Sequence, residues 1–93
     1  MLAVTQDMTI TREDFLRSLP AAVGTAFTVN GQGIASSEAQ RPWRIELTAL
    51  DDLRLGRFVL PRHRVRIFLT GYGATETKRF LDRFELHFRR AGG

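Results

Sequence analysis

Histidine is the side chain best suited to proton transfer at neutral pH, and the sequence has two, His63 and His87. General acid–base catalysis would use one of them or a carboxyl group in an unusual environment. His63 falls on the expected inward side of a strand, and His87 falls at the border of an apolar helix stripe. Both places are typical of residues at the edge of a core. The two rings would meet only if the last helix packed antiparallel to that strand.

The acidic residues predict neither a catalytic pair nor a metal site. Asp51 and Asp52 are adjacent, so their side chains point apart, and the pair is typical of a turn. Glu46 stands alone among outward-facing residues, and no group of His, Asp and Glu has ligand spacing. The absence of cysteine excludes a thiolate metal site, a disulfide and a cysteine nucleophile. With no serine in a nucleophile elbow, the sequence predicts no catalytic residue, no metal and no cofactor.

One glycine-containing segment, residues 71–76, joins an expected strand to an expected helix, which is where a phosphate-binding loop would lie. The segment lacks the Walker pattern and the third glycine of a dinucleotide fingerprint. Glu76, in the first helical turn, would also repel a phosphate. We therefore interpret the segment as a tight connector whose glycines give backbone freedom.

The net charge of +4 is unevenly placed along the 93 residues. Residues 1–40 carry two arginines against four acids, whereas residues 41–93 carry twelve basic residues against six acids. Five arginines and no acid lie between Leu53 and Thr75. This asymmetry favours an anionic partner. A compositional origin stays open, because all but one of the basic residues are arginine, as GC-rich coding also produces.

Length and composition predict one globular domain over residues 1–93. Hydrophobic residues make up 43% of the chain and charged residues 26%, which is the globular range. No stretch approaches the about 20 apolar residues that span a bilayer. Residues 1–7 lack the basic region and the long apolar run of a signal peptide. We therefore expect no membrane span and a cytoplasmic location.

The first helix is expected to begin at Arg12. Thr11 is a suitable N-cap, and Asp14 is placed to reach back to the Thr11 amide, as in a capping box. Ile10 and Phe15 have the spacing of a hydrophobic staple. These signals predict the start of the helix from local chemistry alone.

Helix ends follow from proline, glycine and capping residues. Pro20 should end or kink the first helix, and Gly24 ends the segment in either case. Thr75 is the expected N-cap of the last helix. The apolar stripe of that helix consists of Phe80, Leu81, Phe84 and Phe88. Its surface carries two charge pairs at i,i+4 spacing, Lys78–Asp82 and Glu85–Arg89.

Between the helices the pattern predicts short strands over residues 25–30, 33–37, 43–48, 53–60 and 63–69, with a weaker first strand over residues 2–10. Asn30-Gly31 is typical of a type I′ hairpin turn. Asp51-Asp52 predicts a second turn, and Pro61 is expected to end a strand.

The strand over residues 53–60 carries apolar residues on both of its faces: Leu53, Leu55, Phe58 and Leu60. A β-bulge at Gly56 would return all four to the core. It would also place three residues outside, namely Arg54, Arg57 and Val59.

These elements predict an α+β fold: an antiparallel meander sheet of four to six strands, with an N-terminal and a C-terminal amphipathic helix packed on one face. The order is (β)αββββ(β)α. It resembles the half-repeat of the TATA-binding-protein-like fold and, more loosely, the helix-grip and cystatin-like folds. The resemblance covers element order alone and implies no function.

The uncovered face of that sheet is the leading candidate for binding. Five arginines and one aromatic ring are expected to point away from the helices: Arg44, Arg54, Arg57, Arg64, Arg66 and Phe68. Arginine and aromatic residues are enriched at protein interfaces, which favours an acidic protein partner or a homodimer. The same combination holds single-stranded nucleic acid in several folds, so nucleic acid is the alternative partner.

A third hypothesis is a small-ligand carrier with a pocket between the helices and the sheet. The residues expected near such a pocket are His63, Trp43, Phe84 and His87. Membrane-surface binding by the last helix is disfavoured, because its apolar stripe is needed to cover the sheet. The sequence therefore predicts a non-enzymatic binding module, with nucleic-acid binding and ligand carriage as alternatives.

Overall fold

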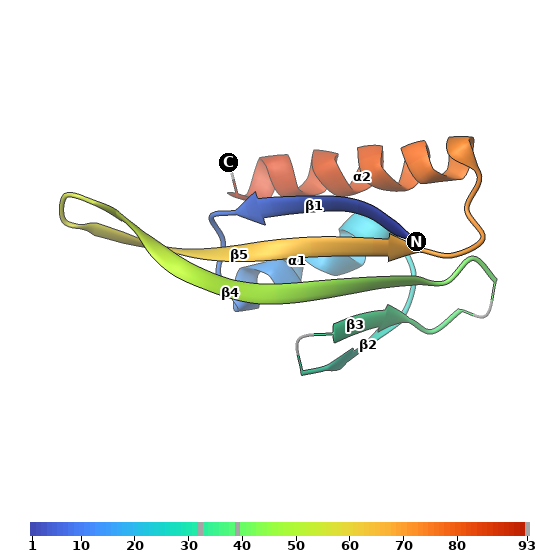
Figure 1. The fold of residues 1–93 in the computed structure, drawn as a ribbon, viewed down its shortest axis with the longest axis horizontal. Helices are drawn as coiled ribbons and strands as arrows, with labels where there is room; N and C mark the ends of the chain where they lie inside the picture. The colour runs from blue at the N-terminus through green and yellow to red at the C-terminus, as the bar shows by residue number, and fades with distance from the viewer. Residues whose placement is uncertain (32, 39, 93) are drawn as a thin grey trace.

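The computed structural model describes residues 1–31, 33–38 and 40–92 of the chain. The two helices are α1 (Arg12–Val23) and α2 (Ala74–Gly92). The five strands are β1 (Leu2–Met8), β2 (Phe27–Asn30), β3 (Gly33–Ser36), β4 (Trp43–Leu55) and β5 (Phe58–Leu69). The molecule measures 46 × 25 × 21 Å along its principal axes, and its length comes from β4 and β5 (Figure 1).

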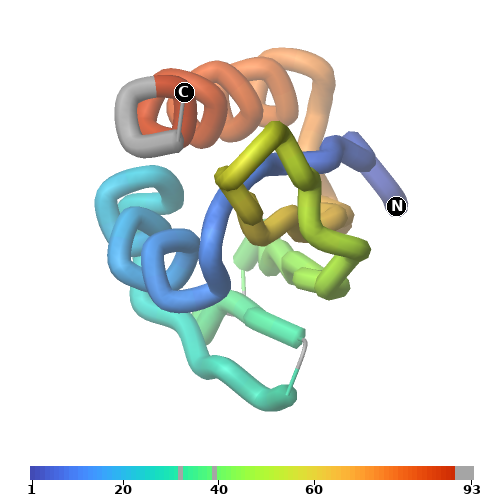
Figure 2. The backbone as a smooth tube through the Cα atoms, turned by 90° about the vertical axis from the view of Figure 1, so that its left-hand side faces the viewer, coloured from blue at the N-terminus to red at the C-terminus, as the bar shows by residue number. Residues whose placement is uncertain are grey.

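The strands form one antiparallel sheet in the order β1-β5-β4-β3-β2. Strands β2 to β5 follow one another as a meander, and β1 adds to the free side of β5. Both helices lie on the same face of the sheet and pack against each other (Figure 1, Figure 2). The predicted α+β fold, with an antiparallel sheet and both helices on one face, is confirmed.

The core lies between the two helices and the inward face of the sheet. Phe15 of α1 stacks on Phe88 of α2 with ring centroids 4.7 Å apart, and Phe84 of α2 tilts against both rings. In the part of β4 and β5 that the helices cover, the inward residues are buried: Trp43, Ile45, Leu47, Val65, Ile67 and Leu69. They recur at every second position, as a sheet with one covered face requires.

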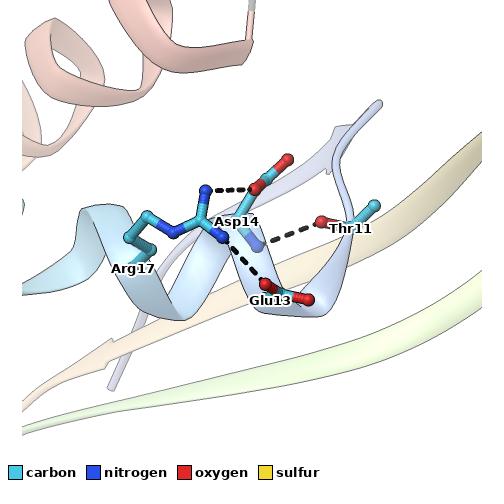
Figure 3. A network of polar contacts seen from close by, with 4 residues as sticks. All are labelled: Thr11, Glu13, Asp14 and Arg17. Carbon is cyan, nitrogen blue, oxygen red and sulfur yellow. Dashed lines mark hydrogen bonds and ion pairs between the residues drawn. The ribbon is translucent and has the colours of Figure 1, made fainter.

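The start of α1 carries the predicted cap (Figure 3). The Asp14 amide donates to the Thr11 hydroxyl oxygen over 3.0 Å, and both Ile10 and Phe15 are buried. The Asp14 carboxylate pairs with Arg17 at 3.0 Å. The predicted N-cap hydrogen bond is therefore confirmed, whereas the predicted return bond of the capping box is wrong, because the Asp14 carboxylate pairs with Arg17 and not with the Thr11 amide.

Helix α1 continues past Pro20, so of the two effects predicted for the proline, an end or a kink, the end is wrong. Ala22 and Val23, beyond the proline, are buried, and this burial offsets the hydrogen bond that proline cannot donate. Gly24 ends the helix with a φ of 71°, and its amide donates to the Pro20 carbonyl over 2.9 Å. The predicted role of Gly24 is confirmed.

Helix α2 begins at Ala74, so Gly73 occupies the N-cap position and the prediction of Thr75 as N-cap is wrong. The Glu76 carboxylate accepts from the Gly73 amide over 3.0 Å, and this hydrogen bond lowers the pKa of Glu76. The hydrogen bond between the Glu76 side chain and the N-cap amide therefore fixes where α2 begins. The two predicted charge pairs form, Lys78–Asp82 and Glu85–Arg89. No helix in the described ranges has both the length and the apolar character needed to cross a membrane.

Strands β4 and β5 form one long hairpin where the sequence predicts three strands. β4 runs through Asp51 and Asp52, and β5 runs through Pro61, so the predicted turn at the aspartates and the predicted strand end at the proline are wrong. The register shifts at this level, where the two aspartates oppose Pro61 alone. This is the bulge of the hairpin, and a proline fits there because the hydrogen-bond ladder is already interrupted.

The chain reverses at Gly56-Arg57, between the paired residues Leu55 and Phe58. Gly56 has a φ of 59°, which suits the first central residue of a type II′ turn. The predicted bulge at Gly56 is therefore wrong, because the glycine is a turn residue.

The predicted hairpin between β2 and β3 forms with a shift of one residue. Asn30 pairs with Gly33 and belongs to the strand, so Asn30-Gly31 are not its two central residues. Gly31 has a φ of 62°, and residue 32 lies outside the described residues.

Candidate functional site

The face of the sheet opposite the helices is uncovered in the described part of the chain. We call its central part the open face and define it by six residues of β1, β4 and β5: Asp7, Arg44, Glu46, Arg64, Arg66 and Phe68. Those of β4 and β5 alternate with buried positions, so their side chains point away from the helices. The structure thus brings together four of the six predicted surface residues.

Glu46 is the carboxylate at the centre of the open face. It accepts from Arg44 Nη1 over 2.7 Å and from Arg66 Nη1 over 3.3 Å. The two guanidinium groups also lie over the Phe68 ring, 4.2 Å and 5.4 Å from its centroid. These cation–π contacts hold the arginines and occupy ring surface that a nucleic-acid base would use for stacking.

Asp7 of β1 engages the arginines on the other side of the open face. Its carboxylate accepts from Arg64 Nε over 2.8 Å and from Arg64 Nη2 over 3.2 Å, and Arg62 Nη2 lies 3.9 Å away. The hydrogen bond from Arg64 lowers the pKa of Asp7 and raises the pKa of Arg64. Because these groups are exposed, the pair orders the surface more than it stabilises the fold.

The ion pairs leave the open face only moderately positive. Four guanidinium groups, counting Arg62, meet two carboxylates, which leaves a surplus of two positive charges. Each guanidinium carries five N–H donors, so donors remain for a partner. The face is suited to carboxylates on another surface, at a lower charge density than the five arginines that the sequence predicts there would have on their own.

Beyond the open face, β4 and β5 continue as a two-stranded ribbon, residues 50–62, which we call the arm. It projects past the ends of both helices (Figure 1), and Figure 2 looks onto its tip. Two apolar pairs, Leu53 with Leu60 and Leu55 with Phe58, line one side of it. We call these four residues the apolar row. Leu55 is 55% exposed and Phe58 is 70% exposed, so the prediction that the row enters the core is wrong.

Register explains why the apolar row faces outward. Along β5, Phe58 and Leu60 alternate in step with Arg64 and Arg66, so they continue the open face. On β4 the extra residue of the bulge shifts the alternation by one, and a shift of one moves a strand's side chains to the other face. The apolar row is therefore continuous with the open face.

The two predicted surface arginines of the arm do not join the open face. Arg54 pairs with Val59 on the opposite side of the arm, and Arg57 lies in the turn, so their predicted placement beside the other arginines is wrong. Both are exposed, as are Asp51 and Asp52. Among the described residues none of these four charges forms an ion pair.

Trp43 and Phe84, two of the predicted pocket residues, belong to the core. They are 4% and 2% exposed, and the Trp43 Nε1 donates to the Thr25 hydroxyl over 3.1 Å. Three surface hollows of about 300, 310 and 460 Å³ are lined by other residues. The two aromatic side chains therefore stabilise the fold where the sequence suggests a ligand site.

The two histidines are each placed against backbone carbonyl groups. His63 Nδ1 lies 2.8 Å from the Ile10 carbonyl oxygen, and His87 Nδ1 lies 3.0 Å from the Arg83 carbonyl oxygen one turn earlier in α2. In the parts of the chain that the structure describes, no three residues of the types His, Cys, Asp and Glu gather as a metal site requires.

A hollow of about 310 Å³ lies where the end of α1 meets the start of α2. Its lining includes three arginines and two glutamates, namely Arg41, Arg79, Arg83, Glu38 and Glu76. Tyr72 also lines it, and burial raises the pKa of this tyrosine. Arg83 is already engaged, because its Nε donates to the Ala21 carbonyl over 3.0 Å. The mixed charges give this hollow no clear preference for an anion.

Comparison with protein-family models, with curated proteins and with solved structures finds no match for this chain. The fold and its surface nevertheless define a structural class. It is a small α+β domain with one sheet face covered by helices, ion-paired arginines on the other face, and an exposed apolar arm.

Sequence reasoning missed the arm, the place of Asp7 on the open face and the arginine partners of Glu46, although it placed Glu46 on the outward side. The dipeptide Gly56-Arg57 between apolar residues is the signal for the arm, because glycine at the first central position is typical of a type II′ hairpin. No local signal joins Asp7 to Arg64, which are 57 positions apart in the chain. That contact depends on β1 pairing with β5.

Proposed function

We propose that the protein is a non-enzymatic binding module that engages an acidic protein or a second copy of itself through the open face and the arm. The observation that carries the proposal is the exposed apolar row, which runs onto the arginines of the open face. Contiguous exposed apolar side chains with polar surroundings are typical of interaction sites, and arginine and aromatic residues are enriched there. A cytoplasmic location is part of the same proposal.

Nucleic-acid binding by the open face is a second candidate, favoured by the surplus of positive charge. The geometry supports it less, because Arg44 and Arg66 already lie over Phe68, and stacking platforms offer aromatic rings to successive bases. Titration of labelled single- and double-stranded oligonucleotides from about 50 to 200 mM salt tests this candidate. Binding that survives at the upper salt and is lost in an Arg64→Ala/Arg66→Ala variant would replace protein binding as the proposal.

Affinity capture with three immobilised forms tests the proposed function: wild type, Phe68→Asp and Val29→Asp. Val29 is 44% exposed on β2, so its change to Asp is a matched control away from the open face. We expect a protein that wild type and Val29→Asp retain and that Phe68→Asp loses, with the affinity then measured by calorimetry on the purified pair. A protein retained equally by all three forms would contradict the proposal, as would the absence of both a partner and self-association.

A further inference from the structure

We infer that the outer edge of β1 binds an extended acidic peptide, which adds to the five-stranded sheet as a further strand in a groove between β1 and α2. This inference rests on the proposed binding of an acidic protein and adds the conformation in which a segment of that protein is held.

The strand β1 lies at one edge of the sheet, and two of its residues direct their backbone groups away from the sheet. Met1 and Leu69 exchange backbone hydrogen bonds over 3.1 and 2.9 Å, so every second residue of β5 from Leu69 faces β1. The β1 residues opposite these positions bond to β5: Val4, Gln6 and Met8. Thr5 and Asp7 lie between them and each turn one N–H and one C=O toward the free edge.

This part of the edge lacks the features that protect the other free edges of the sheet. Five consecutive residues, Val4 to Met8, keep one register with β5, and none of them is proline or lysine. In the arm, by contrast, Pro61 interrupts one edge and the bulge at Asp51-Asp52 interrupts the other. The strand β2, at the far edge, has only four residues. A regular, unpaired strand edge is where an extended peptide adds to a sheet.

A hollow of about 300 Å³, which we call the edge groove, gives such a peptide space beside β1. Gln6 and Asp7 point to opposite faces of the strand and both line the hollow, so it lies along the edge itself. On its other side α2 supplies Phe88 and the ion pair of Glu85 with Arg89. The edge groove is therefore bounded by a strand edge and a helix.

The position of α2 favours a single segment of chain over a second copy of the domain. In both views α2 runs alongside β1, beyond it as seen from β5 (Figure 1, Figure 2). A two-fold axis that paired two copies through this edge would bring the second α2 to the side of the sheet where the first already lies. An extended peptide carries no such helix and fits between β1 and α2.

The two sides of the edge groove favour a peptide in which apolar and acidic residues alternate. On the helix side, Met8 and Phe88 offer apolar contacts. On the side of the open face, Arg62 and Arg64 share the single carboxylate of Asp7, which leaves one positive charge for a partner. Successive side chains of a strand point to opposite faces, so a peptide with alternating residues places each kind on its matching side.

Fluorescence anisotropy with labelled synthetic peptides tests the inference, at protein concentrations from roughly 1 µM to 1 mM. The probe alternates valine and glutamate over about nine residues, enough to cover the paired part of β1. A peptide that alternates valine and lysine is the charge control. We expect the valine–glutamate peptide to bind at least about tenfold more tightly than the control. Equal binding of the two peptides, or no binding of the probe at about 1 mM, would overturn the inference.

Proline at the edge tests the backbone contact. Thr5→Pro removes the outward amide and leaves the bonds to β5 in place, so it should weaken binding of the valine–glutamate peptide about tenfold or more. Thr5→Val keeps the amide and should bind as wild type does. Circular dichroism checks that each variant is folded. Binding by Thr5→Pro that equals that of wild type would overturn the inference.

Val29→Pro is the matched control on the opposite edge of the sheet. The Ser37 amide donates to the Ala26 carbonyl over 3.0 Å, so the alternation along β2 turns the Val29 amide toward the free edge as well. Val29→Pro should therefore fold and bind the valine–glutamate peptide as wild type does. An equal loss in Val29→Pro and Thr5→Pro would contradict a site at β1.

Peptides with N-methyl groups test which of their side chains face the arginines. Peptide residues opposite Thr5 and Asp7 share the face of these two residues and direct their own amides toward β1. In the probe these residues are the glutamates. Methylation of the glutamate amides should therefore abolish binding, whereas methylation of the valine amides, which point away from β1, should leave it unchanged. The reverse result would overturn the proposed alternation.

The inference and the proposed function fail in different ways. A protein that wild type captures, that Phe68→Asp loses and that Thr5→Pro retains would leave the proposed function standing and overturn the inference. Peptide binding that is lost in Thr5→Pro, together with neither a captured protein nor self-association, would support the edge groove as a site and contradict the proposed function of the open face and the arm.

Discussion

The same two strands behave differently at their two ends. Near the helices, Ile45 and Ile67 pair across β4 and β5 and are each 0% exposed. In the arm, Leu55 and Phe58 pair across the same two strands and are 55% and 70% exposed. The residue types are equally apolar, so what differs is the cover that α1 and α2 supply.

This difference shows that alternating apolar residues indicate which side chains share one face of a strand. The alternation does not indicate whether another element covers that face. The hydrophobic effect stabilises a strand only to the extent that its apolar area leaves water. The covered part of the hairpin thus contributes to folding, whereas the arm keeps apolar area that binding can still bury.

Truncating one phenylalanine in each region should give the largest contrast. Phe15→Ala removes a fully buried ring that stacks on Phe88, and we expect it to lower the free energy of unfolding by about 3–5 kcal/mol. Phe58→Ala should change it by no more than about 0.5 kcal/mol. Urea unfolding at a concentration where the chain is monomeric measures both values.

A second pair of substitutions removes fewer atoms and can be measured if the Phe15→Ala variant does not fold. Ile45→Val should cost about 1 kcal/mol, and Leu55→Val should cost only a few tenths of a kcal/mol. Equal costs at the two positions would mean that the arm is part of the cooperative core, which contradicts the comparison.

A positive-φ glycine can be compared in each part of the molecule: Gly24 ends α1, which helps to cover the sheet, and Gly56 lies at the tip of the arm. The expected difference in the free energy of unfolding between these two sites is smaller. A Cβ at Gly24, where φ is 71°, would lie 2.7 Å from Arg83 Nη1, so Gly24→Ala strains the backbone and displaces that side chain. We expect it to lower the free energy of unfolding by about 1–2 kcal/mol. Gly56→Ala meets the same backbone strain, but no atom lies within 4 Å of its Cβ.

Because the tip of the arm can open without the core, Gly56→Ala should act on local exchange more than on global unfolding. Amide hydrogen exchange should quicken in residues 50–60 and stay unchanged in the covered part of β4. Gly33→Ala is the control, since Gly33 has no positive φ and its nearest neighbour, the Asn30 carbonyl oxygen, would lie 3.5 Å from a Cβ. A global loss for Gly56→Ala as large as that for Gly24→Ala would contradict the separation of the two regions.

The covered region was also the more predictable one, although Thr75 was wrongly expected to cap α2. The cap at Thr11, the end at Gly24 and the alternation from Trp43 to Leu47 are signals that act within a few residues. The elements they mark agree with the structure. Such signals suffice where neighbouring residues decide the conformation.

The arm was not predicted because two turn signals compete within seven residues. Asp51-Asp52 and Gly56-Arg57 both suit a reversal, and only the register with β5 decides between them. The position of the turn also determines which face each residue between the two signals occupies. Placing the turn at Asp51-Asp52 therefore led to the wrong prediction that Leu55 is buried. The contacts of Asp7 with Arg64 and of Glu46 with Arg66 depend likewise on strand pairing, which no local pattern specifies.

The smallest effect concerns the ion pair that joins β1 to the open face. The hydrogen bond from Arg64 holds the pKa of Asp7 below its ordinary value of 3.8. The folded state therefore binds a proton less readily than the unfolded state. Its contribution to stability is present above the ordinary pKa and is lost as the pH falls through the folded value.

Asp7→Asn should therefore lower the free energy of unfolding slightly at neutral pH, with a difference from wild type that shrinks as the pH falls below about 4. Urea unfolding across this range measures the difference. Arg64→Gln removes the same hydrogen bond from the other side and should show the same pH dependence, whereas combining the two changes should add little. A difference from wild type that grows as the pH falls would contradict the pairing. Arg64 would then be free to turn toward a partner.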